Sequence, residues 1–150
     1  MSGRITMLGG PNLAQLGRRE PRIYGTMTWR ELTDLCHRWA READLKLVFA
    51  QTDSEGELVG LVRRAGAESD GLILNAAAYP HTSVAVRDAV ACLSIPVIEL
   101  HLTNPAAREP LRRRNFLAGV ATASICGFGP AGYRLAISGM RELLAADSRG

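Results

Sequence analysis

The sequence predicts an α/β fold in which a parallel sheet carries helices on both faces. The chain has 150 residues, of which 47% are hydrophobic, and this suits one domain with one core. Short apolar runs of strand length alternate along it with segments of helical periodicity. That alternation is typical of repeated strand–helix–strand units, which form parallel sheets.

Five apolar runs are predicted as strands, at residues 4–8, 45–50, 71–75, 96–101 and 123–126. Five strands in a chain of this size favour the flavodoxin-like strand order 2-1-3-4-5. Sheets of this type place ligands beyond the carboxyl ends of their strands. The functional site is therefore expected at that edge.

Helix starts are indicated by capping residues. Thr28 and Glu31 have the spacing of a capping box, and Ser54 and Glu57 repeat it before the next apolar-periodic segment. Two further helices are predicted over about 83–93 and 130–144. A short extra helix is predicted over 108–114.

Basic character comes almost entirely from arginine. The net charge is +3, and Lys46 is the only lysine. One cluster is dense, comprising Arg108, Arg112, Arg113 and Arg114. It is interpreted as a solvated helix face, an anionic-substrate pocket, a subunit contact or, last, a nucleic-acid site, since no aromatic residues for base stacking lie between the arginines.

The three cysteines, Cys36, Cys92 and Cys126, lie far apart within apolar patterns. Such a set is neither a disulfide framework nor a metal site, so buried free thiols are expected. The chain shows no basic-then-apolar signal at its N-terminus and no apolar run of transmembrane length. A cytoplasmic protein is therefore expected.

Polar clusters follow four of the predicted strands, beginning at Gly9, Asp53, Asn75 and His101. In a parallel sheet these clusters meet at one edge. The first is part of a connection at 9–27, which is long for a strand–helix loop of about 2–6 residues. We expect its segment 17–27 to be a mobile lid, with Gly17 and Gly25 as hinges.

An arginine and a tyrosine lie close together in this lid. Tyrosine is almost fully protonated at neutral pH, but a charged guanidinium nearby favours the phenolate. Arg19 and Tyr24 thus predict a general base, the alternative being that Tyr24 only packs the lid. Glu99 and His101 point to the same face of one strand, where the carboxylate can fix the imidazole tautomer and suit it to act as an acid. The alternative is a purely structural pair.

Amide and imidazole groups complete the predicted site. Asn75 ends a strand, and its amide can both donate and accept hydrogen bonds. His81 leads into the next helix, where Asp88, taken alone, is interpreted as a solvated residue. The run from Gly127 to Gly132 matches a dinucleotide-binding motif, but no strand follows its helix, so a tight turn is predicted instead.

Five motifs occur in order along the chain: Gly10-Pro11-Asn12-Leu13, Arg19-Glu20-Pro21 through Tyr24-Gly25, Asn75 through Tyr79-Pro80-His81-Thr82-Ser83, Val84 through Arg87-Asp88, and Glu99-Leu100-His101-Leu102-Thr103-Asn104. Arg108-Glu109, Arg112 and the Gly127-Phe128-Gly129 turn continue the pattern. With these motifs the chain resembles, from about residue 5 to residue 144, the type II 3-dehydroquinate dehydratases.

The resemblance implies a flavodoxin-like enzyme that converts 3-dehydroquinate to 3-dehydroshikimate without metal or cofactor, as a dodecamer of trimers. Tyr24 matches the family's base, Arg19 its partner and His101 its acid. Asn12 matches the asparagine near a water that stabilises the enolate. The matching substrate contacts are Asn75, His81, the Leu102-Thr103 backbone and Arg112, with Asp88 reaching across a subunit contact.

Several positions depart from the family's usual pattern. They are Gly9, Ala76-Ala77-Ala78, Pro80, Pro105-Ala106 and Leu111. Because Pro80 and Pro105 fix backbone beside binding residues, the alternative is a non-catalytic homologue, or one of altered specificity that binds a related small carboxylate. The sole lysine, Lys46, opens a predicted strand away from the ligand edge, which disfavours a Schiff-base route to the same dehydration.

Overall fold

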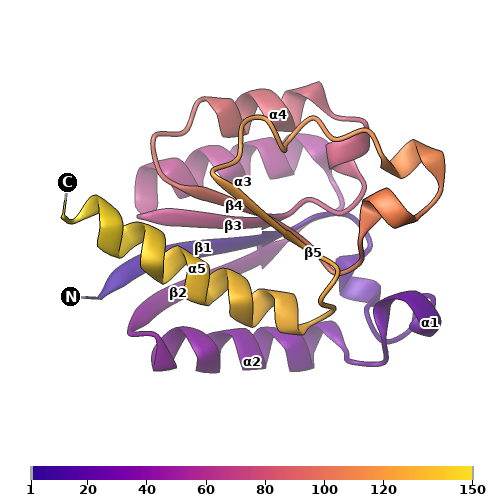
Figure 1. Ribbon diagram of the computed structural model, residues 1–150, viewed down its shortest axis with the longest axis horizontal. Coiled ribbons are helices and arrows are strands. Elements are labelled where there is room, and N and C mark those ends of the chain that lie inside the picture. Colours follow the sequence, from indigo (N-terminus) through magenta and orange to yellow (C-terminus); the bar gives the residue numbers. More distant parts are fainter. Residues whose placement is uncertain (1, 150) are drawn as a thin grey trace.

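The structure, a computed structural model, describes residues 2–149 and contains a five-stranded parallel sheet in the order β2-β1-β3-β4-β5 (Figure 1). The strands are β1 (Gly3–Gly9), β2 (Leu45–Gln51), β3 (Gly71–Asn75), β4 (Val97–His101) and β5 (Ala123–Cys126). The predicted α/β class and flavodoxin-like order are confirmed. Each strand begins and ends within one residue of its predicted bounds.

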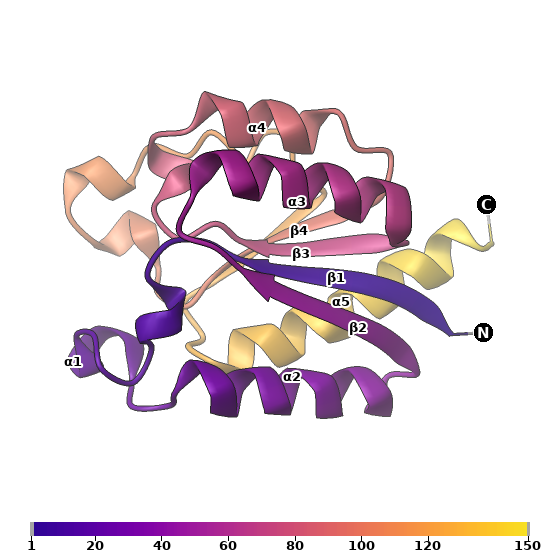
Figure 2. The ribbon, with the colours of Figure 1, turned by 180° about the vertical axis from the view of Figure 1, so that it is seen from behind.

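Two helices cover each face of the sheet. α2 (Trp29–Glu42) and α5 (Ala131–Asp147) lie on one face, and α3 (Glu55–Glu68) and α4 (Val84–Ala91) lie on the other (Figures 1 and 2). The sheet is thus sandwiched between two helical layers, as the strand–helix alternation predicted. None of the helices within residues 2–149 has the length and apolar composition that crossing a bilayer requires.

The core has two halves, one on each side of the sheet. Ile5 and Met7 of β1 pack in the half beneath α2 and α5, whereas Leu8 packs in the half beneath α3 and α4. This division follows from the period of two along a strand. Burial of each such side chain stabilises the fold by about 1.5–3 kcal/mol.

Local capping fixes where the helices begin. The Glu31 N–H donates to Thr28 Oγ1 at 3.2 Å, and the Thr28 N–H donates to Glu31 Oε2 at 3.4 Å, so the predicted capping box forms. Ser54 Oγ accepts from the Glu57 N–H at 3.2 Å in the same way. Because these bonds satisfy first-turn N–H groups, they position the loops that precede α2 and α3.

Two predictions were wrong. Residues 108–114 do not form a helix, but lie in and around two 3-10 turns, η3 (Pro105–Ala107) and η4 (Pro110–Arg112). Each turn begins with a proline, which lacks the N–H that would continue a helix through it. Only Cys36 is buried, whereas Cys92 lies at the exposed end of α4 and Cys126 on the exposed edge strand β5. Burial raises the pKa of the Cys36 thiol to about 12.

The long connection after β1 folds back on itself. It contains a 3-10 turn, η1 (Leu13–Gln15), and a four-residue helix, α1 (Pro21–Tyr24), which the sequence analysis missed. Gly17 and Gly25 have φ values of 87° and 81°, a region that favours glycine. A side chain at Gly17 would meet the Thr26 carbonyl oxygen at 3.0 Å, so the two ends of segment 17–27 lie against each other.

Candidate active site

A small pocket opens at the carboxyl edge of the sheet, between the strand ends and segment 17–27. Its cavity is about 60 Å³. Most of the predicted site residues line it: Asn12, Arg19, Tyr24, Asn75, His81, His101, Leu102, Thr103 and Arg112. The topology therefore gathers side chains from several strand ends into one site, as expected of such folds.

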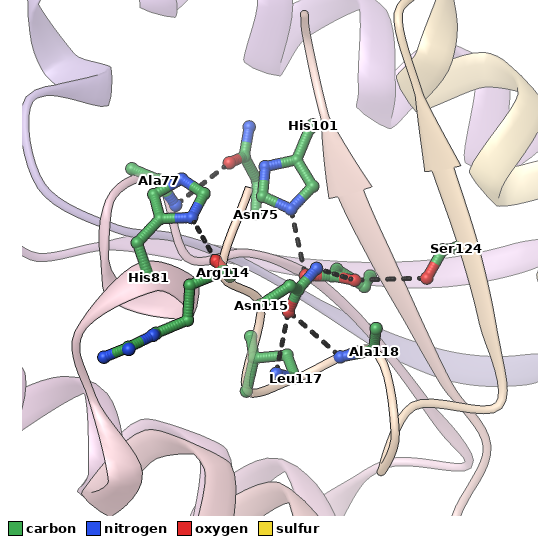
Figure 3. A network of polar contacts seen from close by, with 10 residues as sticks. Asn75, Ala77, His81, His101, Arg114, Asn115, Leu117, Ala118 and Ser124 are labelled. Atoms are coloured by element: carbon green, nitrogen blue, oxygen red, sulfur yellow. Dashed lines mark hydrogen bonds and ion pairs between the residues drawn. The ribbon is translucent and has the colours of Figure 1, made fainter. Parts of the chain in front are cut away.

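Glu99 and His101 form a buried pair at the end of β4. His101 Nε2 and Glu99 Oε2 are 2.9 Å apart, and both residues are almost fully buried. Figure 3 marks this contact with a dashed line from His101. An ionised carboxylate only accepts hydrogen bonds, so it requires the proton on Nε2. The other ring nitrogen of His101, Nδ1, is then available to a ligand.

Further donors hold the Glu99 carboxylate. Asn115 Nδ2 lies 3.0 Å from Oε1 and 2.9 Å from Oε2, and Ser124 Oγ donates to Oε1 at 3.1 Å. Burial by itself would raise the pKa of Glu99. The hydrogen bonds from His101, Asn115 and Ser124 outweigh it, together with the charge of His101, and hold the pKa below its ordinary value. Glu99 is therefore ionised at neutral pH.

His81 is oriented by the backbone. Its Nδ1 lies 2.7 Å from the carbonyl oxygen of Arg114, which only accepts, so Nδ1 carries the proton and Nε2 is the free ring nitrogen. The rings of His81 and His101 stack with centroids 6.3 Å apart (Figure 3). Two imidazoles thus stand side by side at the pocket wall.

Asn75 has a fixed amide orientation. Its Oδ1 accepts from the Ala77 N–H at 3.1 Å, and its Nδ2 donates to the hydroxyl of Tyr133 at 3.1 Å. Tyr133 is fully buried, and that burial raises the pKa of its phenol well above the usual range. One N–H of Asn75 remains for a ligand. Ala77 itself has a left-handed backbone, with a φ of 55°.

Tyr24 lies close to two guanidinium groups. Arg108 donates from Nη1 to the Tyr24 hydroxyl at 2.9 Å, and its guanidinium carbon lies 5.4 Å from the ring centroid. The guanidinium carbon of Arg19 lies 5.2 Å from the same centroid. The predicted partner, Arg19, is therefore near the ring, but Arg108 makes the direct bond to the hydroxyl. The phenol of Tyr24 thus lies close to two positively charged groups.

Asn12 and Arg112 lie at the rim. The Asn12 backbone is left-handed, with a φ of 69°, and its N–H donates to Asp53 Oδ1 at 2.8 Å. This bond leaves the Asn12 side chain to line the pocket. Arg112 pairs with Glu109 at 2.5 Å, and this hydrogen bond is the main reason that the pKa of Glu109 is below its ordinary value.

Asp88 does not line this pocket. It lies on α4, where its exposed carboxylate pairs with Arg87 at 2.8 Å. A wider hollow of about 480 Å³ lies at the opposite, amino edge of the sheet, but none of the predicted site residues lines it. Within residues 2–149, no three His, Cys, Asp or Glu side chains gather closely enough to ligate one metal ion.

Four supporting residues were not predicted as parts of the site: Arg108, Asn115, Ser124 and Tyr133. Arg108 belongs to the arginine cluster described above, and Tyr133 falls in the helix predicted over about 130–144. No local pattern marks Asn115 or Ser124, because each donates a hydrogen bond to Glu99, which lies on a different element of the fold. Only the motif Arg108-Glu109 gave a sequence signal, through the family resemblance.

The fold and the pocket define a flavodoxin-like α/β protein with paired acid–base groups at the carboxyl edge of its sheet. The model of the family described as dehydroquinase class II matches residues 3–141. The 3-dehydroquinate dehydratase of Dinoroseobacter shibae is 50% identical over 96% of this chain and 97% of its own length. That of Hyphomonas neptunium is 51% identical over 95% and 96%.

Solved structures agree. The type II dehydroquinase from Propionibacterium acnes superimposes with a TM-score of 0.91 at 40% identity, over 95% of this chain and 98% of that one. The enzyme from Butyrivibrio crossotus gives 0.91 at 33% identity, over 93% and 97%. The chain belongs to the class II dehydroquinase family, and it is an enzyme of the hydro-lyase class.

Proposed function

We propose that this enzyme removes water from 3-dehydroquinate to give 3-dehydroshikimate, through an enolate. The observation that carries this is that one pocket holds both a tyrosine close to two arginines and a histidine held by a carboxylate. The family membership and the names of relatives at about half identity support the substrate.

Tyr24 is the base in this proposal. Its phenolate takes the proton from the carbon next to the ketone, and the negative charge passes to the ketone oxygen. Arg108 and Arg19 favour the phenolate before the step, because opposite charge stabilises the ionised form. A water near Asn12 stabilises the enolate oxygen as charge develops there.

His101 is the acid. As the enolate collapses, its oxygen re-forms the ketone C=O bond, the electron pair of the enolate C=C bond forms the new carbon–carbon double bond, and the carbon–oxygen bond of the hydroxyl breaks. Nδ1 of a doubly protonated His101 gives its proton to that hydroxyl, which leaves as water. Nε2–H stays bonded to Glu99 throughout, so the ring keeps its orientation after the proton has gone.

Binding is assigned to the remaining polar groups. Arg112 and the backbone amides of Leu102 and Thr103 are suited to the substrate carboxylate. Asn75 donates its free N–H to a hydroxyl, and Nε2 of His81 accepts from one. These groups favour a polyhydroxylated ring over an analogue that lacks a hydroxyl, because the analogue leaves a buried hydrogen-bonding partner unpaired.

Segment 17–27 acts as a mobile lid in this mechanism. A cavity of about 60 Å³ is well below the roughly 300 Å³ at the lower end of small-molecule sites. The substrate therefore enters only after this segment moves, with Gly17 and Gly25 taking up the change in backbone angles. The lid and the rest of the chain belong to one domain in this proposal.

The assembly is the family's dodecamer of trimers. Asp88 is exposed in the single chain and lies outside the pocket, which suits a residue that completes the site of a neighbouring copy. Light scattering on purified protein tests this, and a monomer at assay concentration contradicts it.

A turnover assay tests the function. Purified protein is mixed with 3-dehydroquinate, and the enone absorbance of the product is followed. Steady turnover that disappears in Tyr24→Phe but persists in Ile23→Ala, an exposed neighbour in α1, supports the proposal. Tight binding without turnover, measured by titration calorimetry, favours a non-catalytic homologue instead.

A further inference from the structure

One short loop supports both histidines of the site. The Arg114 carbonyl oxygen accepts from His81 Nδ1, and the next residue, Asn115, donates to the Glu99 carboxylate that holds His101 (Figure 3). The two imidazoles belong to different elements, η2 (Tyr79–His81) and β4. A single turn of chain therefore sets the hydrogen bonding behind both rings.

Asn115 is itself held from behind. Its Oδ1 accepts from the N–H groups of Leu117 and Ala118, at 2.8 and 3.0 Å. These bonds fix which end of the amide faces Glu99, so that Nδ2, the donor, points at both carboxylate oxygens. The loop is anchored by Leu117, which is fully buried in the core beneath α3 and α4.

Ser124 supports the same carboxylate from the opposite side. It lies on β5 directly beside Glu99 in the sheet register, and its hydroxyl donates to Oε1. With His101, three residues from three segments satisfy the two oxygens. A carboxylate so held can neither rotate nor turn an acceptor away from His101 without losing bonds.

We propose that Asn115, assisted by Ser124, is a positioning residue for the dehydration: it fixes Glu99 so that His101 keeps its proton on Nε2 and presents Nδ1 to the leaving hydroxyl. This inference rests on the proposed role of His101 as the acid. Asn115 does not reach the pocket itself, and it acts on the reaction only through Glu99.

A double-mutant cycle tests this route. Asn115→Leu is expected to lower kcat by about 10-fold to 100-fold, since it removes hydrogen bonds to a buried charge, with little change in KM. In a Glu99→Gln background the same substitution lowers kcat no further, because the group through which it acts has gone. An equal loss of kcat in both backgrounds, or no loss in either, overturns the proposal.

Ser124→Ala is the second variant, because it leaves the loop intact. It is expected to lower kcat by about 3-fold to 10-fold, again only when Glu99 is present. If Asn115→Leu does not fold, Ser124→Ala tests whether support of the Glu99 carboxylate affects kcat. Gly119→Ala is the control for loop disturbance and keeps normal kcat, because Gly119 is exposed in the same loop and an added Cβ there meets no atom within 4 Å.

The imidazole protons give a readout that does not depend on turnover. Selective ¹⁵N-histidine labelling of the substrate-free protein reports the tautomer of each ring. In the wild type, neutral His101 is protonated on Nε2 and neutral His81 on Nδ1. Asn115→Leu and Ser124→Ala are expected to give a mixture of tautomers at His101, whereas Ser124→Ala leaves His81 unchanged. If the His101 tautomer is unaltered in both variants, the positioning role of Asn115 and Ser124 is contradicted, while the proposed function is unaffected.

The two proposals can fail separately. An inactive wild type, or full activity in His101→Gln, contradicts the proposed function, while the tautomer measurement still decides the role of Asn115.

Discussion

The pocket has two halves that are built differently. On the strand side, Glu99 and His101 have side chains that are 2% and 10% exposed, and their polar atoms are bonded to neighbouring elements. On the lid side, Arg19 is 39% exposed and pairs only loosely with Glu20, at 3.7 Å. Tyr24 hydrogen-bonds to Arg108 and packs against the core beneath α2 and α5.

The difference separates preorganisation from assembly. The group proposed as acid lies on β4 and the proposed substrate amide lies on β3, and each is oriented by a hydrogen bond to a residue outside segment 17–27. The proposed base lies within segment 17–27, the proposed lid. Strands therefore hold one half of the site, and a loop, which in the proposed mechanism admits the substrate, carries the other half.

The largest effect is expected on the lid side. Tyr24→Phe removes the oxygen that takes the proton, and kcat is expected to fall by about 10³-fold, within the usual range for a general base. Thermal stability should change little, since the hydroxyl is not part of the core. Rates from enone absorbance, with melting curves as the control, check both. If the variant keeps most of its kcat, a group other than Tyr24 is the base.

The bridge between the halves comes next. Arg108→Met keeps much of the side-chain length but loses the bond to Tyr24 and the weaker contact with Thr103 at 3.4 Å. We expect kcat to fall by about 10-fold to 100-fold, as for the loss of a hydrogen bond to a charged group. Amide hydrogen exchange should become faster in 17–27 and stay unchanged in β4. Faster exchange in β4 as well would mean that the two halves are not separable.

A smaller effect is expected from the support of Asn75. Tyr133→Phe leaves a buried Nδ2–H without its acceptor, which costs about 1–3 kcal/mol of stability. The freed amide can also turn, so KM should rise several-fold with kcat nearly constant. Denaturant unfolding and steady-state kinetics measure the two. A fall in kcat at constant KM would show that Asn75 serves the chemical step instead of binding.

The smallest effect concerns acid stability. The pKa of Glu99 is lowered in the folded protein, so below about 4.3, the ordinary value for glutamate, the unfolded chain binds the proton more readily. Glu99 thus stabilises the fold above that pH, and this contribution is lost as the pH falls through the folded-state pKa. Glu99→Gln should show a weaker loss of stability in that window, measured by urea unfolding.

Glu109 provides the contrast. Its pKa is also lowered, through Arg112, but it is exposed, so its contribution should be screened by salt. Glu109→Gln should therefore alter acid stability only at low ionic strength. Equal salt sensitivity at both sites would argue that Glu99 is not shielded from solvent.

The parts that the sequence predicted are those with local signals. Strand runs, the capping box at Thr28 and the alternation that pairs Glu99 with His101 all depend on residues close in the chain. Arg108 meets Tyr24 across 84 positions, and Asn75 meets Tyr133 across 58. Only the folded chain brings such groups together. The helix predicted over 108–114 does not form, since the prolines at 105 and 110 each begin a short 3-10 turn.

Lys46 near the start of β2 has a practical consequence. It is the only lysine of the chain, its side chain is exposed, and it lies at the amino end of a strand whose carboxyl end faces the pocket. Reagents that couple to lysine amines therefore attach a dye or a solid support at the far edge of the sheet, and leave the mouth of the site open to solution.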